Sequence, residues 1–430
     1  TVVGPAATAG APPPTVVGPA AATTAPPKPA RRATPAGVPQ VTLYTIGPGD
    51  EAVEKFGHAT LCLRYPADPR HETVCYDYGT ASFDRPLRLA WGFLRGAGEF
   101  WVSTDYERVT LVRYTLDDRT IWRQDLPLTD EQARRVEQQL LADTADRSWR
   151  YAYQIYQDNC STRIRDILDA AVGGAWRART AVEPEPTGRT FRELGLGPLA
   201  EHPAIVAFLE LTLARAADVP ISRWESMFRP DRLRLEVERF FGAPPVMVRR
   251  QQGPEYRQEL GWGATPYFLF LTVLFALPLA VARWEGRGER VALGVAIVPL
   301  VLIALVVWFV TWVTRIPEGR FNELMVVFLP LDLALLFLDE RWRRWYARIR
   351  VAELALVSLL LAVGALRQPM WIPMLMAFAP FAVLAFIDRR AEPPAAAPPA
   401  AAAPPGDGEP PVSSGGAAPP SGNSTPLQAP

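Results

Sequence analysis

The residues best suited to chemistry lie between positions 151 and 169, where the sequence reads YAYQIYQDNCSTRIRDILD. Asn159 is a favoured residue for the position just before a helix, and apolar residues follow at helical spacing: Ile164, Ile167, Leu168, Ala171 and Val172. Cys160 is therefore predicted in the first helical turn. There its thiol faces the positive end of the helix dipole and several unpaired N–H groups, which lower the pKa of the thiol and could hold an oxyanion.

A histidine upstream supplies a second reactive group. The stretch FGHATLCLRY, residues 56–65, predicts a strand that carries His58. A thiolate beside an imidazole is the usual make-up of a cysteine acyl-transfer site. The alternative is that Cys160 is a small buried apolar residue and His58 a core histidine, because most free cysteines serve packing.

A candidate third group follows from a predicted hairpin. Two strands, HATLCLRY and ETVCYDYG, flank the turn-rich PADPRH. Pairing Cys62 with Cys75 sets one register, and Asp77 then lies one diagonal step from His58, where a carboxylate could hold the imidazole in one tautomer. The two cysteines could form a disulfide or remain separate buried thiols. In another register Asp77 is a solvated strand residue.

Composition divides the chain into four parts. The 430 residues carry 45 basic and 45 acidic side chains, a balance that gives no reason to expect a nucleic-acid partner. Residues 1–40 and 391–430 are rich in Pro and Ala and are predicted to be disordered. Residues 41–260 are polar and mixed, whereas 266–388 are mostly apolar. Because the chain starts at Thr1 rather than Met, we expect a start or signal segment before it.

The apolar region contains five candidate membrane spans. They are residues 266–282, 291–314, 324–338, 352–366 and 370–387. The third and fourth, at about 15 residues, are short for a hydrocarbon core of ~30 Å, so they could instead be re-entrant or buried helices. With five spans, ten arginines fall on one side of the membrane and three on the other, which orients the domain at 41–260 towards the exterior or periplasm.

Several motifs resemble those of one known family. GHA at 57–59, YDYG at 76–79 and YxYxxxxDNCSTRxRD at 151–166 are similar to the Lnb N-terminal periplasmic domain family. LPLTDEQ at 126–132, DxPxSxWExMFxP at 218–230 and FNELMVVFLPLDLALLF at 321–337 also look like that family. The resemblance covers roughly residues 41–390, and one departure is Cys75, where an aliphatic residue is expected.

The resemblance implies an α+β fold. The first domain would be a circularly permuted papain-like domain of the NlpC/P60 type, followed by an α-helical transmembrane domain of about five spans. In a permuted domain the histidine strand precedes the cysteine helix, and His58 does precede Cys160. The expected location is the bacterial inner membrane, as a multi-pass protein with its catalytic domain on the periplasmic side.

The family's best-described members are bacterial lipoprotein N-acyltransferases. The resemblance therefore implies that Cys160 takes an acyl chain from a phospholipid as a thioester and passes it to the N-terminal amine of a lipoprotein. His58 would move the proton and Asp77 would orient His58. Two other functions stay open: an exported thiol hydrolase that uses the same residues, and a non-catalytic membrane scaffold.

Three residues near the thiol are candidates for substrate binding: Asn159, Arg163 and Tyr153. Arg163 could meet a lipid phosphate or simply pair on the helix surface, and Tyr153 could pack beneath the helix. No metal or cofactor is expected, because no spaced set of His and Cys ligands is present. Asp332, inside an apolar run, is either functional or paired between helices. An aromatic set at the RGAG turn would lie at the membrane interface or in a core: Trp91, Phe93, Phe100 and Trp101.

Overall fold

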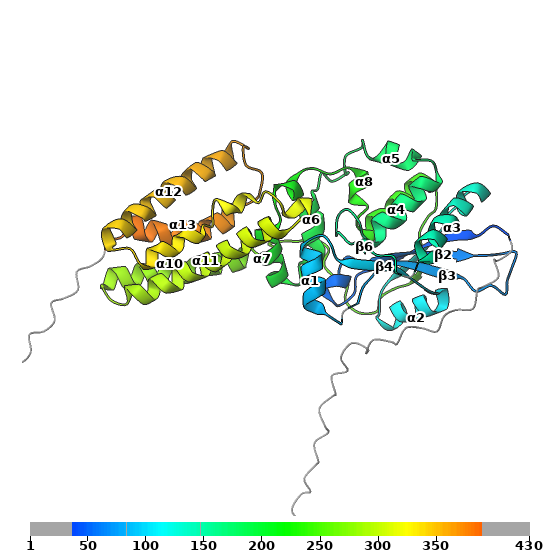
Figure 1. Ribbon diagram of the computed structural model, residues 1–430, viewed down its shortest axis with the longest axis horizontal. Coiled ribbons are helices and arrows are strands. Elements are labelled where there is room, and N and C mark those ends of the chain that lie inside the picture. The colour runs from blue at the N-terminus through cyan, green and yellow to red at the C-terminus, as the bar shows by residue number, and fades with distance from the viewer. Residues whose placement is uncertain (1–36, 83, 147, 389–430) are drawn as a thin grey trace, which may run out of the picture. The chain divides into compact units, whose positions relative to one another are not determined.

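The computed structural model of the protein describes residues 37–388 except Phe83 and Arg147 (Figure 1). The predicted tails fall outside the described residues, apart from positions 37–40. The strands form one sheet in the order β6-β4-β3-β2-β1-β5-β7, with antiparallel neighbours. They are β1 Gln40–Ile46, β2 His58–Arg64, β3 Val74–Thr80, β4 Glu99–Tyr106, β5 Ile121–Asp125, β6 Tyr151–Ala152 and β7 Val246–Arg249.

Helices connect the strands and then make up the apolar region. The helices before that region are α1 Pro86–Leu94, α2 Glu107–Leu116, α3 Asp130–Ala145, α4 Cys160–Ala171, α5 Ala175–Thr180, α6 Phe191–Leu196, α7 Pro203–Thr212, α8 Arg223–Ser226 and α9 Pro230–Phe241. The apolar region contains α10 Thr265–Glu285, α11 Glu289–Val313, α12 Glu340–Ala362 and α13 Trp371–Phe386. Short 3-10 turns are η1 Ala52–Glu54, η2 Gly197–Leu199, η3 Arg215–Asp218, η4 Pro317–Gly319, η5 Glu323–Met325 and η6 Pro330–Leu336.

The sheet is packed on both faces, so the first domain has the expected α+β class. Helices α3 and α4 lie over one face and α2 over the other (Figure 1). Side chains alternate along each strand, and each face therefore builds its own core. The core under α4 includes Leu43, Leu61, Leu63, Tyr78, Ile164 and Leu168. The core under α2 includes Tyr44, Ile46, Cys62, Cys75 and Tyr114.

The predicted hairpin register is confirmed. Strand β2 pairs with β3 through Leu61–Tyr76, Cys62–Cys75 and Leu63–Val74. Of the two alternatives for the facing cysteines, the structure has the disulfide, and both half-cystines are fully buried. The bridge therefore ties the two strands that carry His58 and Asp77.

In the described part of the chain, two helices are long and apolar enough to cross a membrane, namely α10 with 21 residues and α11 with 25. They correspond to the predicted spans 266–282 and 291–314. Each carries a row of exposed large apolar side chains: Leu269, Phe270, Val273 and Leu277 on α10, and Val298, Leu302, Leu305 and Phe309 on α11. Apolar surface of this extent is unfavourable in water and suits contact with lipid.

The remaining predicted spans do not form long apolar helices. Residues 324–338 fold largely as the short turns η5 and η6, and η6 begins at Pro330. Helix α12 starts in the charged stretch ERWRRWYARIR and reaches only part of 352–366. Helix α13 is apolar but only 16 residues long. By length and composition, two helices within the described residues qualify as spans.

Asp332 is paired between elements of the apolar region. Its carboxylate accepts hydrogen bonds from the hydroxyl of Tyr346 at 2.7 Å and from Nη2 of Arg350 at 3.3 Å, both on α12. Arg350 also donates to the carbonyl of Val327 at 2.6 Å. Of the two interpretations of Asp332, the structure shows the one in which the carboxylate is paired between elements. These bonds satisfy a carboxylate and a backbone carbonyl that would otherwise be costly to bury.

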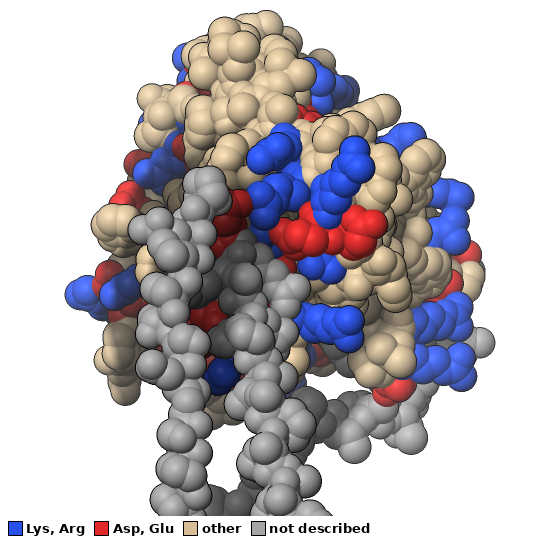
Figure 2. Space-filling view, turned by 90° about the vertical axis from the view of Figure 1, so that its left-hand side faces the viewer, with Lys and Arg blue, Asp and Glu red and all other residues tan. Residues whose placement is uncertain are grey.

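Ion pairs join the ends of α10, α11 and α12. Arg283 is fully buried and donates to Glu289 at 2.7 Å and to Glu340 at 2.6 Å. Arg344 donates to Asp388 at 2.6 Å. Figure 2 views this end of the helices and shows basic side chains gathered around acidic ones. These are the segments whose arginines place them on the cytoplasmic side in the sequence-based topology.

The disulfide should contribute to stability. It closes a loop with a sequence separation of 13, which restricts the unfolded chain. The double variant Cys62→Ala/Cys75→Ala should therefore melt about 5–10 °C below the wild type. Melting curves of the detergent-solubilised protein, with and without reductant, would measure this. Reductant should lower the wild-type midpoint and leave that of the variant in place, and an identical response of the two proteins would refute the role.

Candidate active site

Helix α4 holds Cys160 at its first residue because Asn159 caps the helix. Asn159 Oδ1 accepts hydrogen bonds from the N–H groups of Ser161 and Thr162, each at 2.9 Å. In return, Thr162 Oγ1 accepts from the N–H of Asn159 at 2.7 Å. This reciprocal arrangement is a capping box, which fixes the backbone on both sides of the thiol. The predicted start of the helix is confirmed.

The side-chain amide of Asn159 anchors the cap to the surrounding domain. Its Nδ2 donates to the carbonyls of Ile155 at 2.6 Å and Phe228 at 2.8 Å. An amide offers two N–H donors and one oxygen with two lone pairs, so every hydrogen-bonding position of this side chain is occupied. In this structure Asn159 positions the nucleophile, and its contact with substrate stays a prediction.

The cap reduces the number of free N–H groups at the helix start. Those of Ser161, Thr162 and Arg163 all donate to oxygens of Asn159. Within the part of the chain that the structure describes, the N–H of Cys160 is left without a partner in this turn. The prediction of several unpaired N–H groups at the helix start is therefore corrected to one, available for a substrate oxygen. The backbone N–H of Ala59 also donates to the sulfur of Cys160.

His58 and Asp77 meet where β2 begins. His58 Nε2 lies 3.2 Å from Asp77 Oδ1 on β3, which confirms the predicted diagonal contact. Because Nε2 is engaged by the carboxylate, Nδ1 is the ring nitrogen left for the sulfur of Cys160. Asp77 is buried, and its Oδ2 has no hydrogen-bond partner among residues 37–388 as described.

A gap in the sheet lets the imidazole and the thiol approach each other. The His58 ring lies on the α2 side, with its centre 6.0 Å from that of Tyr114, whereas α4 packs on the opposite face. The β2–β3 ladder stops at Leu61–Tyr76, three residues short of the start of β2. Beyond that pair the two strands are joined by side-chain hydrogen bonds rather than by the backbone ladder, and the two reactive groups meet there.

Gly79 makes room for this arrangement. It lies at an irregularity in the β3–β4 pairing and has a φ of 94°, a conformation that side chains disfavour. A Cβ at this position would lie 3.3 Å from Cε2 of Tyr153 and 3.9 Å from the Cβ of Cys160. Both the backbone and the closeness of the thiol therefore favour glycine.

The two reactive groups change each other's protonation. Burial raises the pKa of the Cys160 thiol, but the charge and hydrogen bond of His58 outweigh burial, so the pKa lies below its ordinary value. Burial lowers the pKa of His58, yet Tyr114, the charge of Cys160 and the bond to Asp77 together raise it well above its ordinary value. The pair therefore favours a thiolate beside an imidazolium.

Aromatic residues form one wall of the site. Tyr153 lies against Gly79 and stacks on Phe100 of β4, with 4.5 Å between ring centres. Phe93 and Phe100 pack with the core under α4, so for these two the buried-cluster interpretation holds. The contacts of Tyr153 are those of packing, and a role in substrate binding rests only on its place beside the thiol.

Arg163 is engaged by a neighbouring carboxylate. Its Nη2 donates to Asp158 Oδ2 at 2.6 Å, and its Nε donates to Oδ1 of the same residue. The guanidinium also lies 4.4 Å from the ring centre of Tyr151. Of the two interpretations of Arg163, the structure shows the ion pair. A phosphate could bind both of these guanidinium nitrogens only if the pair with Asp158 opened.

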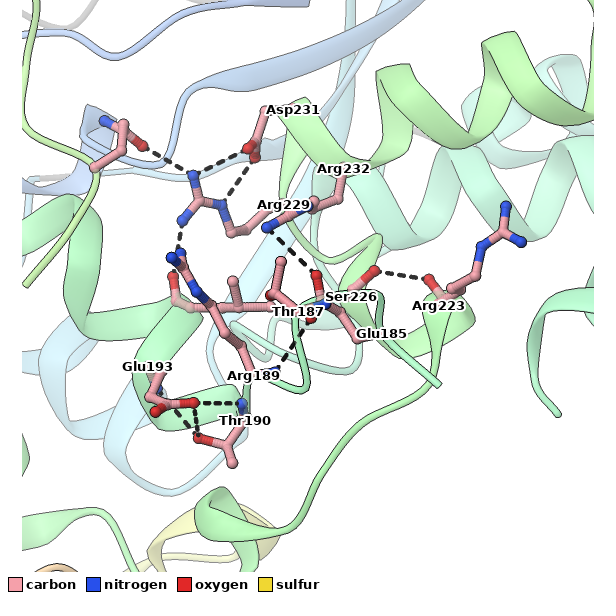
Figure 3. Close-up of polar contacts among 12 residues, drawn as sticks. Glu185, Thr187, Arg189, Thr190, Glu193, Arg223, Ser226, Arg229, Asp231 and Arg232 are labelled. Atoms are coloured by element: carbon pink, nitrogen blue, oxygen red, sulfur yellow. Dashed lines mark hydrogen bonds and ion pairs between the residues drawn. The ribbon is translucent and has the colours of Figure 1, made fainter. Parts of the chain in front are cut away.

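A buried glutamate organises the segment that follows α5 (Figure 3). Glu185 accepts hydrogen bonds from the N–H groups of Thr187 at 2.8 Å and Arg189 at 3.2 Å. Arg232 of α9 lies 3.4 Å from its other oxygen. The turn at 185–189 is thereby fixed to α9.

Arg229 fixes the motif DxPxSxWExMFxP to its surroundings. It donates to Asp231 at 2.8 Å and to the carbonyl of Leu194 at 3.1 Å (Figure 3). Its neighbour Phe228 receives the amide of Asn159, so this network supports the helix cap directly. From the sequence these residues have no predicted role, and the motif itself is the available signal.

Gln157 connects the thiol loop to the loop that follows α11. Its Nε2 donates to Glu318 Oε1 at 2.8 Å, and the carbonyl of Glu318 accepts from Ala214 N–H at 2.6 Å. Nearby, a Cβ at Gly96 would lie 3.2 Å from Ile316 of the same loop. The end of a candidate membrane helix therefore contacts the segment that leads into Cys160. The sequence did not predict this contact.

No metal site is evident: among the described residues, no group of three or more His, Cys, Asp or Glu side chains could hold an ion.

The thiolate form of Cys160 should persist below the pH at which an ordinary cysteine protonates. Because His58 holds down the pKa of the thiol, wild-type alkylation by iodoacetamide should stay fast below pH ~8.5, and its midpoint should rise in His58→Ala. Intact mass over a pH series measures the rate. Cys160→Ala is the control and should not label, since Cys62 and Cys75 are bridged. Identical midpoints for wild type and His58→Ala would contradict the pairing.

Gly79→Ala should disturb the thiol more than its backbone strain alone explains. The new methyl group would press on Tyr153 and Cys160, so the alkylation rate of Cys160 should change. Gly173→Ala is a matched control, because Gly173 also has a positive φ, of 74°, but its Cβ would meet nothing within 4 Å. Both variants should melt a few degrees low, from a strain of about 1 kcal/mol or more. An equal alkylation rate in the two variants would argue against the close approach.

Comparison with known proteins agrees with this arrangement. Residues 27–194 match the model of the Lnb N-terminal periplasmic domain, a range that includes His58, Asp77 and Cys160. No curated protein and no solved structure matched the chain. The match supports the Lnb-type family, and together with the two long apolar helices it indicates a membrane protein with a periplasmic domain.

Proposed function

We propose that the protein is a membrane-bound, thiol-dependent lipoprotein N-acyltransferase that acts on the periplasmic side of the bacterial inner membrane. The observation that carries the proposal is the pairing of Cys160 with His58, which Asp77 holds by its ring nitrogen. A domain of this kind joined to apolar helices suits a reaction whose acyl donor lies in the membrane. The contact of Gln157 with Glu318 supports this link.

The first half-reaction loads the enzyme. The thiolate of Cys160 attacks the ester carbonyl of a phospholipid, and the N–H of Cys160 donates to the carbonyl oxygen as it gains charge. The carbon–oxygen ester bond breaks, and the imidazolium of His58 gives its proton to the leaving glycerol oxygen. The products are an acyl thioester on Cys160 and a lysophospholipid.

The second half-reaction transfers the acyl chain. The N-terminal amine of a lipidated protein attacks the thioester carbonyl, and neutral His58 takes the proton that the amine loses. The carbon–sulfur bond breaks, an amide forms, and the thiolate–imidazolium pair returns. Asp77 keeps the same tautomer and ring orientation through both steps. The scheme is ping-pong and needs no cofactor.

Further features belong to the same proposal. The order of His58 before Cys160 suits a permuted papain-like domain, and the capped helix carrying the thiol is consistent with one. The multi-pass membrane domain would comprise α10 and α11 together with the shorter apolar segments that pack against them. Buried in protein, the turns of 324–338 could lie at membrane depth without exposing backbone groups to lipid.

Acyl transfer tests the proposal. The full chain in phospholipid vesicles should transfer a labelled acyl chain to a diacylglyceryl lipopeptide with a free N-terminal amine, but not to its N-acetylated twin. Cys160→Ala should abolish transfer, and His58→Ala should lower kcat by about 10²–10⁴-fold. Asp77→Ala should cost less than Cys160→Ala. Mass spectrometry of the lipopeptide measures the product.

The label also identifies the donor and the competing functions. When the phospholipid carries the label, the label should appear in the new amide. If the amide is labelled only when the label starts in the lipopeptide's own ester, the lipopeptide itself supplies the acyl chain. Release of free fatty acid or cleaved peptide without amide would favour the hydrolase. Transfer at the wild-type rate by Cys160→Ala would rule out the thiol mechanism.

A further inference from the structure

A cavity of about 580 Å³ lies beside α1, apart from the thiol. Its lining is unusually rich in arginine and tryptophan. The polar and aromatic lining residues are Ser82, Asp84, Arg85, Arg88, Trp91, Arg95, Glu99, Trp101 and Arg150. The proposed acyl transfer uses none of these side chains.

The charges around the cavity favour an anion. Four guanidinium groups face two carboxylates, and one of these carboxylates, Glu99, pairs with Arg88 at 3.3 Å. The other, Asp84, accepts from the hydroxyl of Ser82 at 2.7 Å. After these pairings a positive excess remains, to which Arg85 and Arg95 contribute. Planar guanidinium groups bind phosphate oxygens in a two-point geometry.

Two of the arginines lie over the tryptophans of the same cavity. The guanidinium of Arg150 is 4.5 Å from the ring centre of Trp101, and that of Arg95 is 5.8 Å from Trp91. Arg150 also donates from Nη1 to the carbonyl of Trp149 at 2.8 Å. For Arg95, the guanidinium held against an aromatic face presents the N–H groups at its edge to an oxygen ligand. The rings therefore help to orient the arginines.

The cavity lies at the level where a candidate membrane helix ends. The ring of Trp91, which is 45% exposed, lies 6.2 Å from that of Phe309 on α11, near the end of that helix at Val313. Trp312 on the same turn is 76% exposed. Exposed aromatic residues at the end of a span are typical of the lipid headgroup level. Leu87 of α1, 86% exposed, adds apolar surface at this place.

Strand alternation separates the cavity from the thiol. Phe100 and Tyr151, which pair between β4 and β6, face the core that contains Cys160. Their neighbours Trp101 and Arg150 therefore point to the other side of this sheet edge, into the cavity. A ligand bound there would not be in the path of the acyl transfer.

We propose that this cavity binds the phosphodiester headgroup of an anionic membrane phospholipid. Arg85 and Arg95 would contact the phosphate, and Trp91 would lie beside the glycerol and the start of the acyl chains along α11. The bound lipid holds α1 against the membrane surface and so fixes the height of the thiol domain above the bilayer. It is a structural lipid, distinct from the acyl donor.

Lipid retention tests the site without reference to catalysis. The full chain in detergent is incubated with phosphatidylglycerol or phosphatidylcholine, and bound lipid is measured by native mass spectrometry. The wild type should retain phosphatidylglycerol preferentially. Arg85→Ala/Arg95→Ala should weaken its retention about 30-fold, since each of the two arginines near a membrane surface contributes ~1 kcal/mol. Cys160→Ala should retain the lipid as the wild type does.

A matched control removes the same charge elsewhere. Arg70 and Arg134 are exposed and outside the cavity, so Arg70→Ala/Arg134→Ala should leave retention at the wild-type level. Equal retention of the two lipids, or equal loss in both double variants, would overturn the site. Binding of inorganic phosphate with no retained lipid would overturn the lipid assignment. Acyl transfer that fails while retention persists would count against the proposed function alone.

Discussion

The position of the thiol depends on the way Asn159 caps α4. One side chain closes the helix start through Ser161 and Thr162 and holds the carbonyl of Phe228. Loss of such a cap costs about 1 kcal/mol in stability, but the larger effect would be on geometry, because a nucleophile misplaced by about 1 Å can lose 10²-fold in rate. The hydrogen bonds and ion pairs around Arg229 and Glu185 hold the segment that contains Phe228, whose carbonyl accepts from Asn159.

Local patterns in the sequence were sufficient for the parts of the site that depend on local structure. The cap and the apolar spacing after Cys160 predicted the helix, and the facing cysteines predicted the register that brings Asp77 to His58. Contacts between distant segments left no local pattern. Gln157 and Glu318 are 161 residues apart. The pairing of Arg163 with Asp158 depends on the conformation of the short loop before α4.

In the apolar region, hydropathy predicts some membrane helices correctly and others wrongly. A long uncharged run such as residues 291–313 of α11 must form a helix to satisfy its backbone in an apolar setting, so this prediction is strong. The run at 324–338 has a similar composition but contains Asp332, and it folds as short turns held by Arg350. An apolar composition indicates that a segment is shielded from water, but it does not distinguish contact with lipid from burial inside the protein.

The central claim is that Cys160 carries the acyl chain, and its most direct test is a single-turnover trap. The purified full chain is mixed with labelled phospholipid without acceptor, quenched in acid and measured by intact mass. The claim predicts one acyl group per chain, mapped to Cys160, removed by hydroxylamine and discharged when a lipopeptide amine is added. A protein that transfers label to the lipopeptide but never carries it on Cys160 would contradict the thioester mechanism.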